Sequence, residues 1–158
     1  MIAKVGVELA APFVFDYCRR WHIPVENPDR LDDIWWFGVI IENRLRAMVG
    51  LQLITDDTMF VWGFFGDGSG TADEARAIAT ISRLIDQLPW KLEGVILLEN
   101  ERMRRHARKH GWRFHKIDTE TGGRPQGKYV RDSLERIREA TGRPTARRRI
   151  AASREATG

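Results

Sequence analysis

The chain has 158 residues, of which 42% are hydrophobic and 30% charged, and it carries a formal net charge of +4. This composition is ordinary for a globular domain with its own core. It excludes an intrachain disulfide, because Cys18 is the only cysteine, and no apolar run approaches the roughly 18 residues of a membrane span. Glu8 and Asp16 interrupt the apolar N-terminal stretch, so we expect no secretory signal and a cytoplasmic protein.

The positive charge is concentrated toward the end of the chain. Residues 131–158 hold eight arginines against four acidic residues, whereas residues 1–130 have equal numbers of basic and acidic side chains. The folded body is therefore not expected to bind nucleic acid. We divide the chain into a domain over 1–130 and a C-terminal amphipathic helix with an arginine-rich tail over 131–158.

The N-terminal residues predict a strand followed by a helix. Residues 2–9 alternate loosely between apolar and polar side chains, as in a short strand. Residues 11–21 then place four side chains within reach of one helical face: Phe13, Phe15, Cys18 and Trp21. The next segment, 22–33, contains two prolines and is predicted to be a loop.

Three strands are predicted to follow as an antiparallel meander. Residues 34–41 and 45–55 are rich in β-branched and aromatic side chains and flank a short turn, as in a hairpin. Residues 58–65 are apolar on both sides, which indicates a central, buried strand.

The second half of the chain alternates strands and helices. Thr71 and Glu74 have the spacing of a capping box, and they precede an apolar helical stripe that Pro89 ends. The predicted elements after it are a strand over 91–100, a helix over 101–110, strands over 112–118 and 128–131, and a final amphipathic helix with Leu134, Ile137 and Ala140 on one side. A meander followed by such an alternation predicts an α/β fold with a mixed sheet and helices on its faces.

The segment "FGDGSGT" joins the buried strand to the capped helix. Its three glycines within five residues allow backbone amides to converge on one point, and the helix N-terminus adds partial positive charge. This arrangement suits a phosphate, although it lacks the Gly-Lys-Ser/Thr of a P-loop. A flexible turn is the alternative interpretation.

The segment "NERMRRHARKHGW", residues 100–112, is a basic helix that Gly111 ends. Its arginines suit either an anion or a solvated surface. His106 and His110 have the i, i+4 spacing of metal ligands, but no cysteine or carboxylate is placed to complete a site, so we predict no metal.

Taken together, these two segments resemble the GNAT (Gcn5-related N-acetyltransferase) family over residues 34–130. "FGDGSG" is similar to that family's pyrophosphate loop, [Arg/Gln]-x-x-Gly-x-[Gly/Ala], through Gly68 and Gly70. The basic segment is similar to its motif Asn-x-x-Ala-x-x-x-Tyr-x-x-x-Gly-Phe through Asn100, Gly111 and Trp112. The resemblance implies a sheet splayed at its centre, with an antiparallel meander beside a parallel strand pair.

The resemblance also implies acetyl-CoA as the ligand and an amine as the acceptor. A backbone amide of the strand over 58–65 would polarise the acyl carbonyl, and the amine would attack it directly. The residues implied to hold the ligand are Gly66, Gly68, Ser69, Gly70, Thr71, Asn100 and Arg105, with Arg104 and Arg108 as further phosphate contacts.

Three departures from the family pattern predict weak or absent catalysis. Phe65 stands at the position of the loop Arg or Gln, and Ala107 stands where a tyrosine commonly protonates the departing thiolate. No carboxylate lies between Met59 and Phe65 to serve as a base. The nearest carboxylates in sequence are Glu42, Asp56, Asp57 and Asp67.

Two other functions are compatible with the same residues. The chain also resembles, more loosely, the small GNAT-like proteins encoded among the virion genes of short-tailed phages, which implies a non-catalytic structural or assembly role in a virion. Six tryptophans and the arginine-rich tail fit contacts with other protein subunits. The tail over 143–158 could also bind nucleic acid without sequence specificity, or remain a solubilising end.

Overall fold

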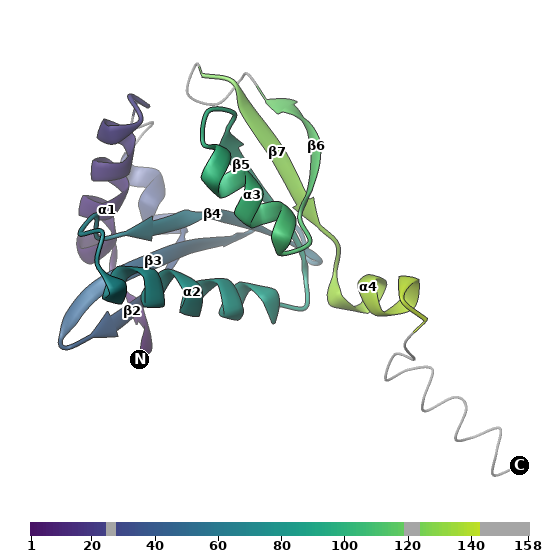
Figure 1. Cartoon of the computed structure of the whole chain (residues 1–158), viewed down its shortest axis with the longest axis horizontal. Coiled ribbons are helices and arrows are strands. Elements are labelled where there is room, and N and C mark those ends of the chain that lie inside the picture. The colour runs from purple at the N-terminus through teal and green to yellow at the C-terminus, as the bar shows by residue number, and fades with distance from the viewer. Residues whose placement is uncertain (25–27, 119–123, 143–158) are drawn as a thin grey trace, which may run out of the picture.

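The computed structural model describes residues 1–24, 28–118 and 124–142. Its elements follow the predicted order (Figure 1). They are β1 (Ile2–Val5), α1 (Val7–Arg20), the 3-10 helix η1 (Pro28–Asp33), β2 (Trp35–Ile41), β3 (Arg44–Leu53), β4 (Thr58–Gly66), α2 (Ala72–Asp86), β5 (Lys91–Leu97), α3 (Glu101–Lys109), β6 (Arg113–Asp118), β7 (Gln126–Arg131) and α4 (Leu134–Ala140).

The strands form one mixed sheet in the order β1-β2-β3-β4-β5-β7-β6. Neighbouring strands are antiparallel except β4 and β5, which are parallel. The predicted fold class, a mixed α/β sheet with an antiparallel meander and one parallel pair, is therefore confirmed.

Helices cover both faces of the meander half of this sheet (Figure 1). One core lies under α1 and η1 and includes Trp36, Met48 and Phe65. The other lies under α2 and includes Val49 and Ile81. These alternating apolar side chains of β2 to β4 are buried on both faces, as the two-sided apolar pattern of β4 predicted.

Two predicted boundaries near the N-terminus were wrong. The strand expected over 2–9 ends at Val5, and α1 begins at Val7 rather than near residue 11. Glu8 lies in the first turn of α1, and Ala10 and Ala11 are strong helix formers, so the helical preference prevails over a loose alternation. The segment expected to be a loop contains η1.

The predicted C-terminal helix is present, but its apolar side is not buried. None of its residues is buried, and Ile137 is 37% exposed. Figure 1 shows α4 projecting from the sheet beyond β7. The tail over 143–158, with its predicted nucleic-acid contacts, lies outside the described residues. No described helix is both long enough and apolar enough to cross a membrane.

Candidate active site

The centre of the sheet opens where β4 and β5 separate. The two strands pair only from Thr58↔Lys91 to Phe60↔Glu93, although both continue well beyond these residues. A cavity of about 260 Å³ lies at this opening. Its lining comes from α1, η1, β2, β4, α2, β5, α3 and β7 and includes Tyr17, Arg30, Trp36, Trp62, Gly63, Phe64, Ser82, Asp86, Gly94, Asn100, Met103, His106, Ala107, His110, Trp112 and Tyr129.

A β-bulge in β4 forms part of the cavity wall. Gly50 pairs with Gly63 and Leu51 pairs with Val61, so Trp62 has no partner residue in β3. Gly63 has a φ of +136°, a conformation that side-chain-bearing residues rarely adopt, which explains a glycine in the middle of this strand. The bulge thus takes part of β4 out of the ladder where the sequence predicted a carbonyl-polarising amide.

The glycine loop between β4 and α2 does gather its backbone amides, as predicted. Gly68 and Gly70 both have positive φ values, of 75° and 66°. Their amides donate to one carboxylate, that of Glu74: Gly68 N to Oε1 at 3.0 Å and Gly70 N to Oε2 at 2.7 Å. The anion that these amides hold is therefore a side chain of the same chain.

The capping box at this loop is only half formed. Thr71 Oγ1 accepts from the amide of Glu74 at 3.3 Å, as the spacing predicted. The Glu74 carboxylate bonds to the loop glycines, however, and the amide of Thr71 bonds instead to Ser69 Oγ at 3.4 Å. The two loop glycines outcompete the expected partner because their positive φ values direct both amides toward the carboxylate.

More carboxylates surround this loop. Asp67 accepts from the amide of Ser69 at 3.0 Å and from Arg46 at 3.1 Å, while Asp73 pairs with Arg46 at 3.6 Å and with Arg76. Burial works to raise the pKa of Asp67, but hydrogen bonds from Ser69 and Arg46 outweigh it and lower the pKa overall. Asp67 therefore stays ionised, and the loop carries negative charge of its own.

Phe65, at the loop position that carries an Arg or Gln in the family, faces the interior. Its ring is 5% exposed and lies 5.3 Å from the ring of Tyr17 and 6.1 Å from that of Trp36, between centroids. The apolar ring packs in the core at this position and has no group that could bind a phosphate.

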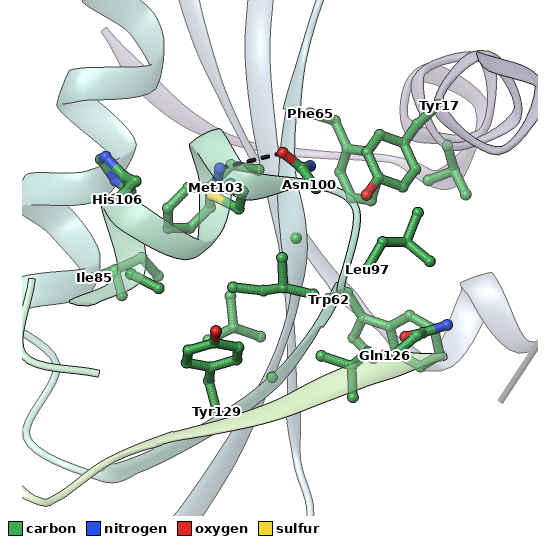
Figure 2. A pocket seen from close by; sticks show the side chains of 18 of the residues that line it. Tyr17, Trp62, Phe65, Ile85, Leu97, Asn100, Met103, His106, Gln126 and Tyr129 are labelled. Carbon is green, nitrogen blue, oxygen red and sulfur yellow. Dashed lines mark hydrogen bonds between the residues drawn. The ribbon is translucent and has the colours of Figure 1, made fainter. Parts of the chain in front are cut away.

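Asn100 lies at the mouth of the cavity and has two partners. Its Oδ1 caps α3 by accepting from the amide of Met103 at 3.2 Å (Figure 2). Its side chain also lies near Tyr17 of α1 and works to lower the pKa of that phenol, but burial outweighs this effect and raises the pKa overall. Asn100 therefore joins α3 to α1 across the opening, and Tyr17 keeps its proton.

Two of the three candidate arginines on α3 have protein partners. Arg104 donates to the hydroxyl of Tyr129 at 3.1 Å and to Leu98 O at 3.1 Å, and Arg108 donates to Glu101 at 3.2 Å. Arg105 is exposed and forms no ion pair with the described residues. Arg105 alone of the three is free to meet a phosphate.

The position of the missing tyrosine, Ala107, lies in the cavity wall and is 6% exposed. Both tyrosines of the chain line the same cavity from other elements. The hydroxyl of Tyr129 is held by Arg104, and its ring is fully buried. Tyr17 is only partly buried, whereas Tyr129 is fully buried, and both are drawn at the pocket in Figure 2.

A polar cluster from α2 and α3 closes one side of the cavity; the sequence singled out His106 and His110 but not their partners Ser82 and Asp86. Ser82 Oγ and His106 Nε2 share a hydrogen bond of 2.9 Å, and His110 Nδ1 lies 2.8 Å from Asp86 Oδ2. Burial, and then the neighbouring His110, lower the pKa of His106, so its imidazole is neutral at neutral pH. Matching i, i+4 pairs on the two helices, Ser82 with Asp86 and His106 with His110, were the available signal.

This cluster does not have the geometry of a metal site. Within 1–24, 28–118 and 124–142, no group of three or more His, Cys, Asp or Glu side chains is arranged to hold an ion. Asp86 is also the one carboxylate among the described residues that line the cavity, since Glu42, Asp56, Asp57 and Asp67 lie elsewhere.

Comparisons with known proteins agree with this geometry at the level of the fold. No family model matches the sequence, and no curated protein sequence matches it either. Solved structures do match. An N-acetyltransferase from Staphylococcus aureus Mu50 superposes with a TM-score of 0.63 at 14% identity, covering 84% of this chain and 96% of that one.

Two further structures give the same result. A GNAT-family acetyltransferase from Bacillus cereus ATCC 10987 has a TM-score of 0.59 at 14% identity, with 85% of this chain and 97% of that one covered. A Bacillus subtilis acetyltransferase, solved in complex with CoA, has a TM-score of 0.56 at 14% identity, with 84% and 98% covered. Identities this low establish architecture rather than activity. The fold of this chain is the GNAT fold, as the two sequence motifs predicted.

Proposed function

We propose that this protein binds an acyl thioester in the cavity between β4 and β5 and transfers the acyl group slowly to an amine. The observation that carries the proposal is the cavity itself, because it lies at the splay of the two parallel strands and has the β4 bulge in its wall. Acetyl-CoA would supply the activated acyl group. The CoA bound by the Bacillus subtilis acetyltransferase of the same fold supports this choice of ligand.

The residues around the cavity suit acyl transfer in three ways. Apolar side chains such as Phe64 and Trp112 keep water away from a bound thioester. His106 is neutral at neutral pH and can accept the proton that an attacking amine loses. Tyr17 keeps its proton and can donate a hydrogen bond into the mouth of the cavity.

Catalysis is expected to be slow because the family's proton donor is absent at Ala107. General acid–base groups typically contribute about 10²- to 10⁴-fold to a rate. His106 bonds to Ser82 through Nε2, and Ser82 Oγ also donates to Ile78 O, so the proton of an attacking amine would be accepted at Nδ1 of His106.

A non-catalytic role as a GNAT-fold interaction protein is the second candidate. One observation favours it: the loop amides that would hold a pyrophosphate already hold Glu74. Exposed Trp35, Trp90 and Ile137 offer apolar surface to another subunit. A place in a phage virion, and a cytoplasmic location, remain predictions from the sequence.

Thermal unfolding with and without acetyl-CoA tests the proposed function. Binding to the folded state raises the melting temperature by mass action, and ligand at 100 times its Kd adds about 2.7 kcal/mol. Met103→Trp should abolish the shift, because Met103 lines the cavity and a larger ring fills it. Arg102→Trp places the same ring on the exposed side of the same helix and should leave the shift intact.

Acyl transfer is then measured as release of free thiol from acetyl-CoA with a panel of primary amines. A shift in melting temperature without any thiol release would favour the interaction protein. If acetyl-CoA at millimolar concentration leaves the wild-type melting temperature unchanged, the acyl-thioester proposal is wrong.

A further inference from the structure

The glycine loop of this protein is filled by its own acidic side chain. Both carboxylate oxygens of Glu74 are bound, one by the amide of Gly68 and one by that of Gly70. The next loop amide, of Ser69, bonds to Asp67, and that of Thr71 bonds to Ser69. No described amide from Gly68 to Thr71 is left for an incoming anion.

The backbone next to the loop is shaped around this carboxylate. A Cβ atom added at Gly66 would lie 2.0 Å from Glu74 Oε1, far inside contact distance. Gly66 has no such atom, so the carboxylate fits against the end of β4. Thr71 holds the backbone of Glu74 from the other side through its cap. The contact therefore depends on several separate residues and is not a side chain resting on a surface.

The charges around the loop oppose a second anion. Asp67, Asp73 and Glu74 contribute three negative charges within eight residues, and the cations paired with them are Arg46 and Arg76. Both guanidiniums are already engaged by these carboxylates. A diphosphate placed at the loop would displace Glu74 and would also meet the charges of Asp67 and Asp73.

The cavity beside the loop has the opposite character. Most of its lining is apolar, and its polar groups include the uncharged side chains of Asn100 and Tyr17, with Arg30 and the paired Asp86 and His110 as the charged or titratable exceptions. An uncharged amide chain ending in a thioester matches this lining, because it needs a few hydrogen bonds and no counter-charge.

We propose that Glu74 is a specificity-determining residue that removes the diphosphate from donor recognition, so that the cavity binds an acyl thioester through its uncharged pantetheine arm. This inference rests on the proposed function, since it concerns the same cavity and donor. Wild-type protein then gains almost nothing from the nucleotide part of acetyl-CoA.

Comparing the affinities for two acyl donors separates the contribution of the pantetheine arm to binding from that of the diphosphate. Titration calorimetry with acetyl-CoA and with S-acetyl-pantetheine, which lacks the diphosphate and the 3′-phosphoadenosine, should give wild-type Kd values within about threefold of each other. Glu74→Ala frees both amides and removes one charge, and we expect it to tighten acetyl-CoA at least tenfold while S-acetyl-pantetheine stays within twofold. Glu74→Gln removes the charge with little change of volume and should shift acetyl-CoA in the same direction.

Glu135→Gln is the matched control, because Glu135 also lies in the first turn of a hydroxyl-capped helix but is far along the chain, on α4. It should change neither Kd. A wild-type protein that binds acetyl-CoA at least tenfold tighter than S-acetyl-pantetheine, with no gain in Glu74→Ala, overturns the inference.

If neither donor binds, the proposed function fails while Glu74 can still be tested. Inorganic pyrophosphate is then titrated while the amide NMR signals of Gly68 and Gly70 are followed. Signals that move in folded Glu74→Ala, or in Glu74→Gln where the alanine variant does not fold, but stay fixed in wild type support the assignment. Signals that behave alike in wild type and in the variants overturn it.

Discussion

At each end of α2 a charged side chain binds the backbone groups, but the two side chains come from different parts of the chain. At the N-terminus, the amides of Gly68 and Gly70 in the preceding loop donate to the carboxylate of Glu74, which lies in the first turn of the helix. At the C-terminus, carbonyls take the guanidinium of Arg131, which arrives from β7: Arg131 Nη1 donates to Ile85 O at 2.7 Å, and Nη2 donates to Leu88 O. Both charges oppose the partial charge of the helix end.

The ends differ in burial and in sequence distance. The Glu74 contacts are exposed and span a few residues, whereas Arg131 is 2% exposed and lies more than 40 residues from its acceptors. Burial lowers the pKa of Arg131, and the negative charge of Asp86 opposes this lowering only in part. The Glu74 contacts therefore need only their own loop and helix turn to form, whereas the Arg131 contacts need β7 to lie against the end of α2.

Arg131→Met is expected to have the largest effect on stability. The substitution keeps an apolar stem of similar length but leaves the carbonyls of Ile85, Leu88 and Trp90 without their donor inside the protein. We expect a loss of about 3 kcal/mol in the free energy of unfolding, measured with urea.

Arg113→Met is the control for that measurement. Arg113 pairs with Asp132 at 3.0 Å on the surface, and we expect a loss of less than about 1 kcal/mol. Equal losses in the two variants would mean that burial does not distinguish the two arginines.

Asn100→Ala tests whether the local cap of α3 contributes to stability as the cap of α2 does. Its Oδ1 caps α3, and loss of such a cap costs about 1 kcal/mol. Asn100→Asp keeps the acceptor while removing the amide that contacts Tyr17, so we expect it to retain most of the stability but to weaken donor binding. Urea titrations of the two variants check this, and an Asp variant as unstable as Ala would assign the loss to the Tyr17 contact.

This local versus long-range difference also decides what the sequence could predict. Thr71, Glu74, Gly68 and Gly70 lie within seven residues, so the loop, its converging amides and the cap were all predictable. The identity of the anion was not, because a capping-box spacing sends the carboxylate to Thr71 and only the backbone angles of the glycines redirect it.

The rest of the site depends on contacts between distant segments. The fold followed from two motifs in register, since Asn100 and Gly111 each fix a helix end by a local rule. Tyr17 reaches Asn100 from α1, a contact between residues 83 positions apart in the sequence that no spacing rule encodes. The same holds for Ser82 with His106, whose pairing needs α2 and α3 to lie side by side on the sheet.

Glu74→Ala is expected to have a smaller effect on stability than on ligand choice. It removes two hydrogen bonds at an exposed helix end, which are worth about 0.5 to 1 kcal/mol together with the helix dipole, while the Thr71 cap remains. Added sulfate or phosphate should restore that loss by occupying the freed amides. A urea titration with and without 50 mM sulfate, at ionic strength matched with chloride to about 150 mM, would reveal the rescue; absence of rescue would argue that the loop rearranges once Glu74 is gone.

The smallest predicted effect is the pH dependence of stability that comes from His106. This residue of α3 contacts α2 along its length, through Ser82, and not at either end. Its pKa is lowered in the folded state by burial and then by His110, with Lys109 and Arg102 acting in the same direction and Asp86 of α2 opposing them. The unfolded chain therefore binds a proton more readily, and stability contributed by neutral His106 is complete above the unfolded value of about 6.5 and is lost as pH falls through the folded value.

Melting temperatures of wild type and His106→Gln between pH 8 and pH 5 isolate this contribution. Glutamine can keep a hydrogen bond to Ser82 but does not titrate, so its melting temperature should fall less below pH 6.5 than that of wild type. His115→Gln, on the exposed strand β6, should follow the wild-type curve. If His106→Gln and wild type lose stability in parallel, the cluster between α2 and α3 holds the helices together without responding to pH, and His106 is unsuited to accept a proton from an amine.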